Sequence, residues 1–130
     1  MRGFDFGTET QVGDFLKDIS EALPAYINSL AYAVHATATL KGWWDKDRGI
    51  AEMIALCHSE LSEALEACRK PQMELSEHIP KFTALEEEIA DTIIRLLDMG
   101  YSQQCQIGEA IIAKMKYNLG RAHKHGGKKF

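Results

Sequence analysis

The chain has 130 residues, of which 45% are hydrophobic and 26% charged, a composition that excludes wholesale disorder and collagen-like or coiled-coil classes. A chain of this length can bury one core without disulfides, so we expect a single domain over residues 1–130. The net charge of −4 argues against a general nucleic-acid-binding surface.

The spacing of apolar residues predicts an all-α bundle of four to five helices. A first helix is expected from about Thr10 to Ala22, within an N-terminal extension of residues 1–23. Pro24 suits the first position of a second helix, which should run to about Lys41 and stop at Gly42.

A third helix follows the connection of residues 42–49. Its apolar stripe comprises Ile50, Met53, Ile54, Cys57, Leu61, Ala64, Leu65 and Cys68. The helix should end near Lys70, because Pro71 follows and the mixed polarity of residues 71–82 is typical of a loop.

A capping box predicts the start of the next helix. The Thr83 hydroxyl and the Glu86 carboxylate can satisfy backbone N–H groups that a helix start leaves unpaired. Gly100 lies near the end of this helix, and a final helix should fade between Gly120 and His123. Residues 124–130 form a basic tail that we expect to be flexible.

Two helices each carry a pair of carboxylates three residues apart. Glu60 and Glu63 lie at the shoulder of one apolar stripe, and Glu88 and Asp91 occupy the same place on the next helix. Antiparallel packing would bring the four together, and their repulsion would then require a cation or protons. Oxygen ligands favour Mg²⁺, with Mn²⁺ as a substitute. The alternative is a solvated face with salt bridges to basic residues such as Arg95.

Candidate ligand-binding residues lie outside this cluster. Lys114, Asn118 and Arg121 form a line of donors on the last helix that could grip phosphate oxygens, or could simply complement the helix dipole. Trp43 and Trp44 must plug the bundle or stack on a planar ligand, and we expect one of each. His35 precedes them and is a further candidate for substrate binding, although structural histidines are commoner.

These segments resemble MazG-like pyrophosphohydrolases, members of the all-α nucleoside triphosphate pyrophosphatase superfamily. The resemblance rests on Trp43-Trp44-Asp45, His58 to Glu66, Glu86 to Asp91 and Lys114 to Asn118. The family signature is Glu-x-x-Glu followed by Glu-x-x-Asp. One departure is Ser59, which stands where the common form of the motif has a further Glu.

The resemblance implies hydrolysis of a nucleoside triphosphate between its α- and β-phosphates. Mg²⁺ held by Glu60, Glu63, Glu88 and Asp91 would polarise the phosphates, and Glu63 or Glu60 would serve catalysis, Glu63 as the acceptor of the water's proton. It also implies a homodimer or homotetramer. Apolar residues beyond a single stripe leave surface to bury and fit that expectation: Leu56, Ile94 and Leu97.

Two alternatives are weighed against this activity. A ferritin-like di-iron site needs Glu-x-x-His pairs, whereas Ala55 and Leu75 precede His58 and His78 by three residues. A non-catalytic helical interaction module stays open, and pyrophosphate release would distinguish it.

The cellular setting is inferred from cysteines and apolar runs. The three cysteines, an odd number without a Cys-x-x-Cys spacing, are expected to be buried reduced thiols. A cytoplasmic protein without membrane or secretion signals is expected, because no apolar run reaches the length of a signal or a membrane span.

Overall fold

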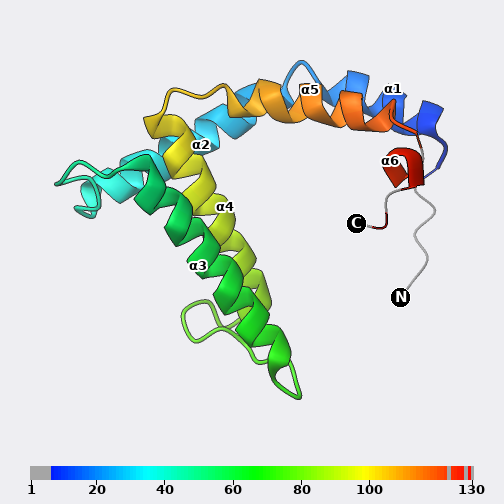
Figure 1. Ribbon diagram of the computed structural model, residues 1–130. Helices are drawn as coiled ribbons and strands as arrows, with labels where there is room; N and C mark the ends of the chain where they lie inside the picture. The colour runs from blue at the N-terminus through cyan, green and yellow to red at the C-terminus, as the bar shows by residue number, and fades with distance from the viewer. Residues whose placement is uncertain (1–6, 123, 128, 130) are drawn as a thin grey trace. The chain divides into compact units, whose positions relative to one another are not determined.

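The computed structural model describes residues 7–122, 124–127 and 129, and these residues are arranged as helices and connections (Figure 1). The helices are α1 (Glu9–Ile19), α2 (Leu23–Leu40), α3 (Ile50–Arg69), α4 (Ala84–Ser102), α5 (Ile107–Leu119) and the single turn α6 (Lys124–Gly127). The described residues contain no β-strand, only an isolated antiparallel bridge between Leu75 and Thr83. The prediction of an all-α fold with four to five main helices is confirmed.

Local hydrogen bonds explain where the helices begin. The predicted capping box is present: the Thr83 hydroxyl accepts from the N–H of Glu86, and the Glu86 carboxylate accepts from the N–H of Thr83. A second capping box joins Thr8 and Gln11 at the start of α1. Pro24 was predicted to be the first residue of α2, but it is the second, so the expected boundary was wrong by one position.

Gly42 ends α2 as predicted, and the way it does so places Trp43. Gly42 has a φ of 83°, a left-handed conformation that costs glycine little. The Trp43 N–H donates to the Ala38 carbonyl at 3.0 Å, and the Gly42 N–H donates to the Thr39 carbonyl at 3.1 Å. This pair of bonds is a Schellman motif, which folds the chain back so that Trp43 lies beside the last turns of the helix.

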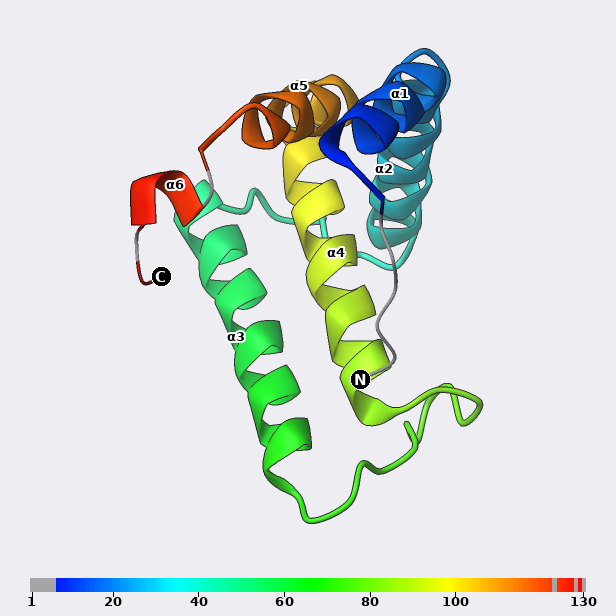
Figure 2. The same ribbon diagram turned by 90° about the vertical axis from the view of Figure 1, so that its right-hand side faces the viewer.

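The chain divides into two compact units, with the boundary between Ser29 and Leu30 inside α2 and again after Cys105. Whether they are one folding domain, as predicted, stays a prediction. In the first unit α1 packs along α5 (Figures 1 and 2), and Leu16 is almost fully buried. The Asn28 side chain accepts from the N–H of Gly108 at 3.0 Å. Asn28 therefore caps α5, whose own N-cap residue makes no side-chain bond.

The second unit is built on α3 and α4, which lie side by side in both views (Figures 1 and 2). A single row of α3 is buried: Met53, Cys57, Glu60 and Ala64. Another row of α3 stays exposed: Ile50, Ile54, Leu61 and Leu65. The predicted stripe therefore combines two rows, and α4 covers one of them.

The split between the rows corrects two predictions. Cys57 is buried as expected, but Cys68 continues the exposed row and Cys105 lies in an exposed connection, so the prediction that all the thiols are buried was wrong for these two. All three thiols are free. Of the apolar residues expected to be surplus, Ile94 is exposed, whereas Leu97 is buried in the core of the unit and Leu56 is half-buried.

No helix within the described part of the chain is both long enough and apolar enough to cross a lipid bilayer.

Candidate functional site

Three of the four predicted carboxylates meet between α3 and α4. Glu60 extends from α3, and Glu88 and Asp91 come from successive turns of α4. One carboxylate oxygen of each lies within 4.8 Å of the others. Oxygen ligands at this separation can hold a divalent cation such as Mg²⁺ or Mn²⁺.

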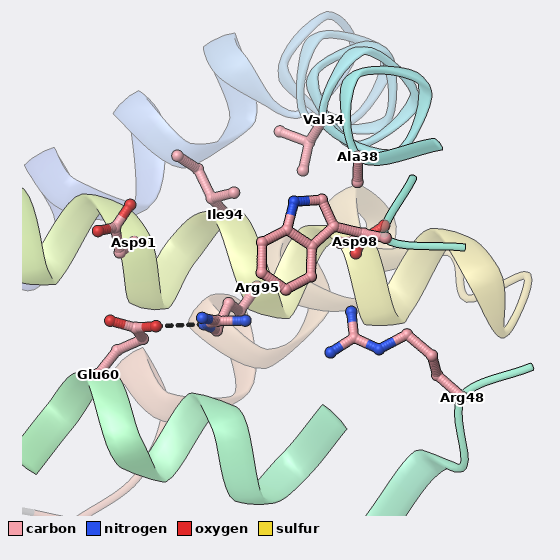
Figure 3. A pocket seen from close by; sticks show the side chains of 9 residues that line it. Val34, Ala38, Arg48, Glu60, Asp91, Ile94, Arg95 and Asp98 are labelled. Atoms are coloured by element: carbon pink, nitrogen blue, oxygen red, sulfur yellow. Dashed lines mark hydrogen bonds and ion pairs between the residues drawn. The ribbon is translucent and has the colours of Figure 1, made fainter. Parts of the chain in front are cut away.

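Burial makes this cluster electrostatically strained. Glu60 is only 6% exposed, and its carboxylate forms an ion pair with Arg95 (Figure 3). The Oε2 atom of Glu88 is buried and has no hydrogen-bond partner among the described residues. A buried oxygen without a partner lowers the stability of the fold unless a hydrogen bond, a proton or a cation compensates it.

The pKa values of the two α4 carboxyls show the same strain. Burial, reinforced by the charges of Glu63 and Glu60, raises the pKa of Glu88 from 4.5 to about 7. Burial and the Glu60 charge also raise the pKa of Asp91. A nearby cation would favour the ionised forms of both and so relieve the strain.

Glu63 has a different position from the other three carboxylates. It is exposed on α3 and is not part of the cluster whose oxygens lie within 4.8 Å. Its negative charge nevertheless contributes to the raised pKa of Glu88, so it lies near the cluster's edge. Its expected roles as metal ligand and proton acceptor stay predictions.

A cavity of about 240 Å³ opens beside these carboxylates. Figure 3 shows side chains that line it, and the set is Val34, Ala38, Trp43, Arg48, Glu60, Asp91, Ile94, Arg95 and Asp98. An adjoining cavity of about 370 Å³ shares Val34, Ala38, Trp43 and Ile94 and is largely apolar. The site thus has a charged end at the carboxylates and an apolar end at Trp43.

The two tryptophans have different environments. Trp43 is 56% exposed and lines both cavities, so its ring is accessible. Trp44 is half-buried, and its indole N–H donates to Asp98 Oδ1 at 3.0 Å. The His35 Nδ1 atom lies 2.7 Å from the same oxygen, and the His35 ring lies 5.0 Å from the Trp44 ring. Asp98 therefore holds both Trp44 and His35 in place.

The predicted phosphate-binding residues belong to the first unit. Lys114 and Asn118 are exposed on α5, and Arg121 lies two residues beyond the end of that helix. The Lys114 ammonium lies 4.5 Å from the centre of the Tyr117 ring. Of the tail, Lys124–Gly127 forms α6, and the expectation for His123, Lys128 and Phe130 lies outside the described residues.

Sequence reasoning assigned no site role to three residues that line the charged cavity. Arg48 is nearly buried and lies over the rings of Trp43 and Trp44, at 5.5 and 5.9 Å from their centres. Its position just after the two tryptophans was the only available signal. Arg95 and Asp98 follow Asp91 by four and seven residues, so helical spacing places all three on one edge of α4. Spacing does not predict which residues they contact.

The chain has no match among protein-family models, curated proteins or solved structures.

Proposed function

We propose that this protein is a Mg²⁺-dependent nucleoside triphosphate pyrophosphohydrolase of the MazG-like kind. It would cleave a nucleotide between the α- and β-phosphates and release a nucleoside monophosphate and pyrophosphate. The main support is the convergence of Glu60, Glu88 and Asp91 beside a cavity whose other end is apolar and carries Trp43. The motif resemblance supplies the reaction class.

The donor set fits a hard divalent cation. All three donors are carboxylates, and the unpartnered Glu88 Oε2 offers a buried oxygen that a cation would satisfy. When bound, such an ion supplies Lewis-acid polarisation of the phosphate and lowers the pKa of a water molecule. Glu60, Glu88 and Asp91 would hold it, and Glu63 at the edge of the cluster would accept a proton from the attacking water.

The cavity orients the nucleotide by its two unlike ends. The polyphosphate belongs at the carboxylate end, where Arg48 and Arg95 add positive charge. The base belongs against the exposed ring of Trp43, because aromatic stacking suits any planar base. The resemblance implies that Lys114, Asn118 and Arg121 bind phosphate, and that role stays a proposal drawn from the motif alone.

The test is pyrophosphate release from the eight common ribo- and deoxyribonucleoside triphosphates with Mg²⁺ or Mn²⁺. We expect release from at least one substrate, and we expect Asp91→Asn to abolish it while the helical circular dichroism signal is kept. The matched control is Asp14→Asn, which changes an exposed carboxylate on α1 that forms an ion pair with Lys17. Full turnover by Asp91→Asn at saturating Mg²⁺ would remove the carboxylate cluster from the mechanism.

A helical interaction module without catalysis is the second candidate. The observation in its favour is the exposed apolar row of α3, since Ile54, Leu61 and Leu65 are each more than 40% exposed. A homodimer or homotetramer of the enzyme would cover the same row, so the row alone does not discriminate. The absence of pyrophosphate release from every substrate would favour the module.

A further inference from the structure

Arg95 forms an ion pair with Glu60, one of the carboxylates that a metal ion would need as a ligand. Glu60 is the most buried carboxylate of the cluster, and the Nε of Arg95 is bonded to its Oε1 atom. Arg95 follows Asp91 by one helical turn on α4 and lines the same cavity (Figure 3). The guanidinium therefore already supplies one positive charge to the carboxylate cluster.

Arg95 is bonded to Glu60 rather than to Asp98, a carboxylate close to it on α4. Asp98, one turn further along α4, accepts hydrogen bonds from Trp44 and is bonded to His35. Arg48 lines the same cavity and adds a second positive charge. Removing Arg95 from Glu60 without replacement would leave a buried, uncompensated carboxylate, which is strongly unfavourable.

A divalent ion and the guanidinium compete for the same carboxylate. An ion bound by Glu60, Glu88 and Asp91 would lie within a few ångströms of the Arg95 charge, and two cations at such a distance repel strongly in a partly buried site. Either the guanidinium moves away or the ion binds weakly.

We propose that Arg95 is an internal competitor that sets the affinity of the site for divalent cations. It compensates Glu60 until an ion takes over that role, and the freed guanidinium then faces the cavity. The inference rests on the proposed function, because it takes the carboxylate cluster to be a metal site. It assigns Arg95 a positioning role through Glu60, separate from any contact with substrate.

The experiment measures Mn²⁺ binding by calorimetry on the full chain, with no nucleotide present. We expect Arg95→Gln to tighten the dissociation constant by about tenfold or more, because it removes the competing charge. Arg95→Lys keeps the charge and should stay within about threefold of wild type. The control is Arg69→Gln, which changes an exposed arginine of α3 that is paired with Glu66 of the same helix. This variant should leave the dissociation constant unchanged. An unchanged or weaker constant in Arg95→Gln would overturn the proposal.

Thermal unfolding supplies a second readout. In chelator, Arg95→Gln should melt below wild type because Glu60 loses its partner, and Mn²⁺ should raise its melting temperature more than that of wild type. If the variant is unfolded in chelator, it must refold when Mn²⁺ is added, and a failure to refold would contradict the proposal. A wild-type protein that binds no Mn²⁺, together with an Arg95→Gln variant that binds none, would instead refute the metal site of the proposed function.

Discussion

The strained carboxyl of Glu88 makes a quantitative prediction for the variant Glu88→Gln. Its pKa is raised from 4.5 to about 7, which corresponds to about 3 kcal/mol of disfavour for the ionised form. Solvent screening of a partly exposed side chain reduces this to about 1–2 kcal/mol. Because glutamine has nearly the same shape without the charge, the variant should be more stable than wild type in chelator at pH 8.5, by about 1–2 kcal/mol.

The pH dependence follows from the sign of the shift. A carboxyl with a raised pKa binds more protons in the folded state than in the unfolded state between pH 4.5 and 7, so the free energy of unfolding falls as the pH rises through this window. At pH 5.5 Glu88 is largely protonated in the folded state but largely ionised in the unfolded state, so the advantage of Glu88→Gln should fall to about half or less of its value at pH 8.5, and it should vanish only below the unfolded pKa of 4.5. In Mg²⁺ at pH 8.5 the order should reverse, because a bound ion stabilises only the wild-type carboxylate.

Urea denaturation followed by circular dichroism, at both pH values and with chelator or Mg²⁺, measures all of these differences. The matched control is Glu66→Gln, on an exposed carboxylate of α3 outside the cluster, and it should show neither the gain nor the Mg²⁺ effect. A Glu88→Gln variant that is less stable than wild type in chelator at pH 8.5 would refute the reasoning.

Three further predictions concern other parts of the chain. Trp44→Phe removes the indole N–H bonded to Asp98 and should lower the free energy of unfolding by about 1–2 kcal/mol. Trp43→Ala changes an exposed ring and should raise the KM for nucleotide with little change in stability. Equal losses of stability in the two variants would contradict these separate roles. Light scattering at micromolar concentration should give a dimer or tetramer, because the exposed row of α3 has apolar area left to bury, and a monomer would contradict it. Deleting residues 124–130 should raise KM or lower kcat several-fold without a change in melting temperature, because the basic tail attracts an anionic substrate; wild-type kinetics would contradict this role.

The sequence by itself determined the features that depend on hydrogen bonds between near neighbours. The capping box of Thr83 and Glu86, the stop at Gly42 and the loop after Arg69 all appear where the residues predict them. Each needs only a few consecutive residues with the right side chains and backbone freedom, so no tertiary contact is required to specify it. Helical spacing likewise placed two carboxylate pairs on two helices.

Only the tertiary structure decided which members of those pairs are buried. Glu60 and Glu63 are the same residue type on neighbouring turns, yet α4 covers the row that contains Glu60 and leaves Glu63 exposed. The same choice separates the buried Cys57 from the exposed Cys68. Periodicity defines the rows of a helix, but which row is covered depends on the position of a partner helix distant in sequence. The contacts of Arg95 with Glu60 and of Asp98 with Trp44 also span long sequence separations, and therefore no local pattern specifies them.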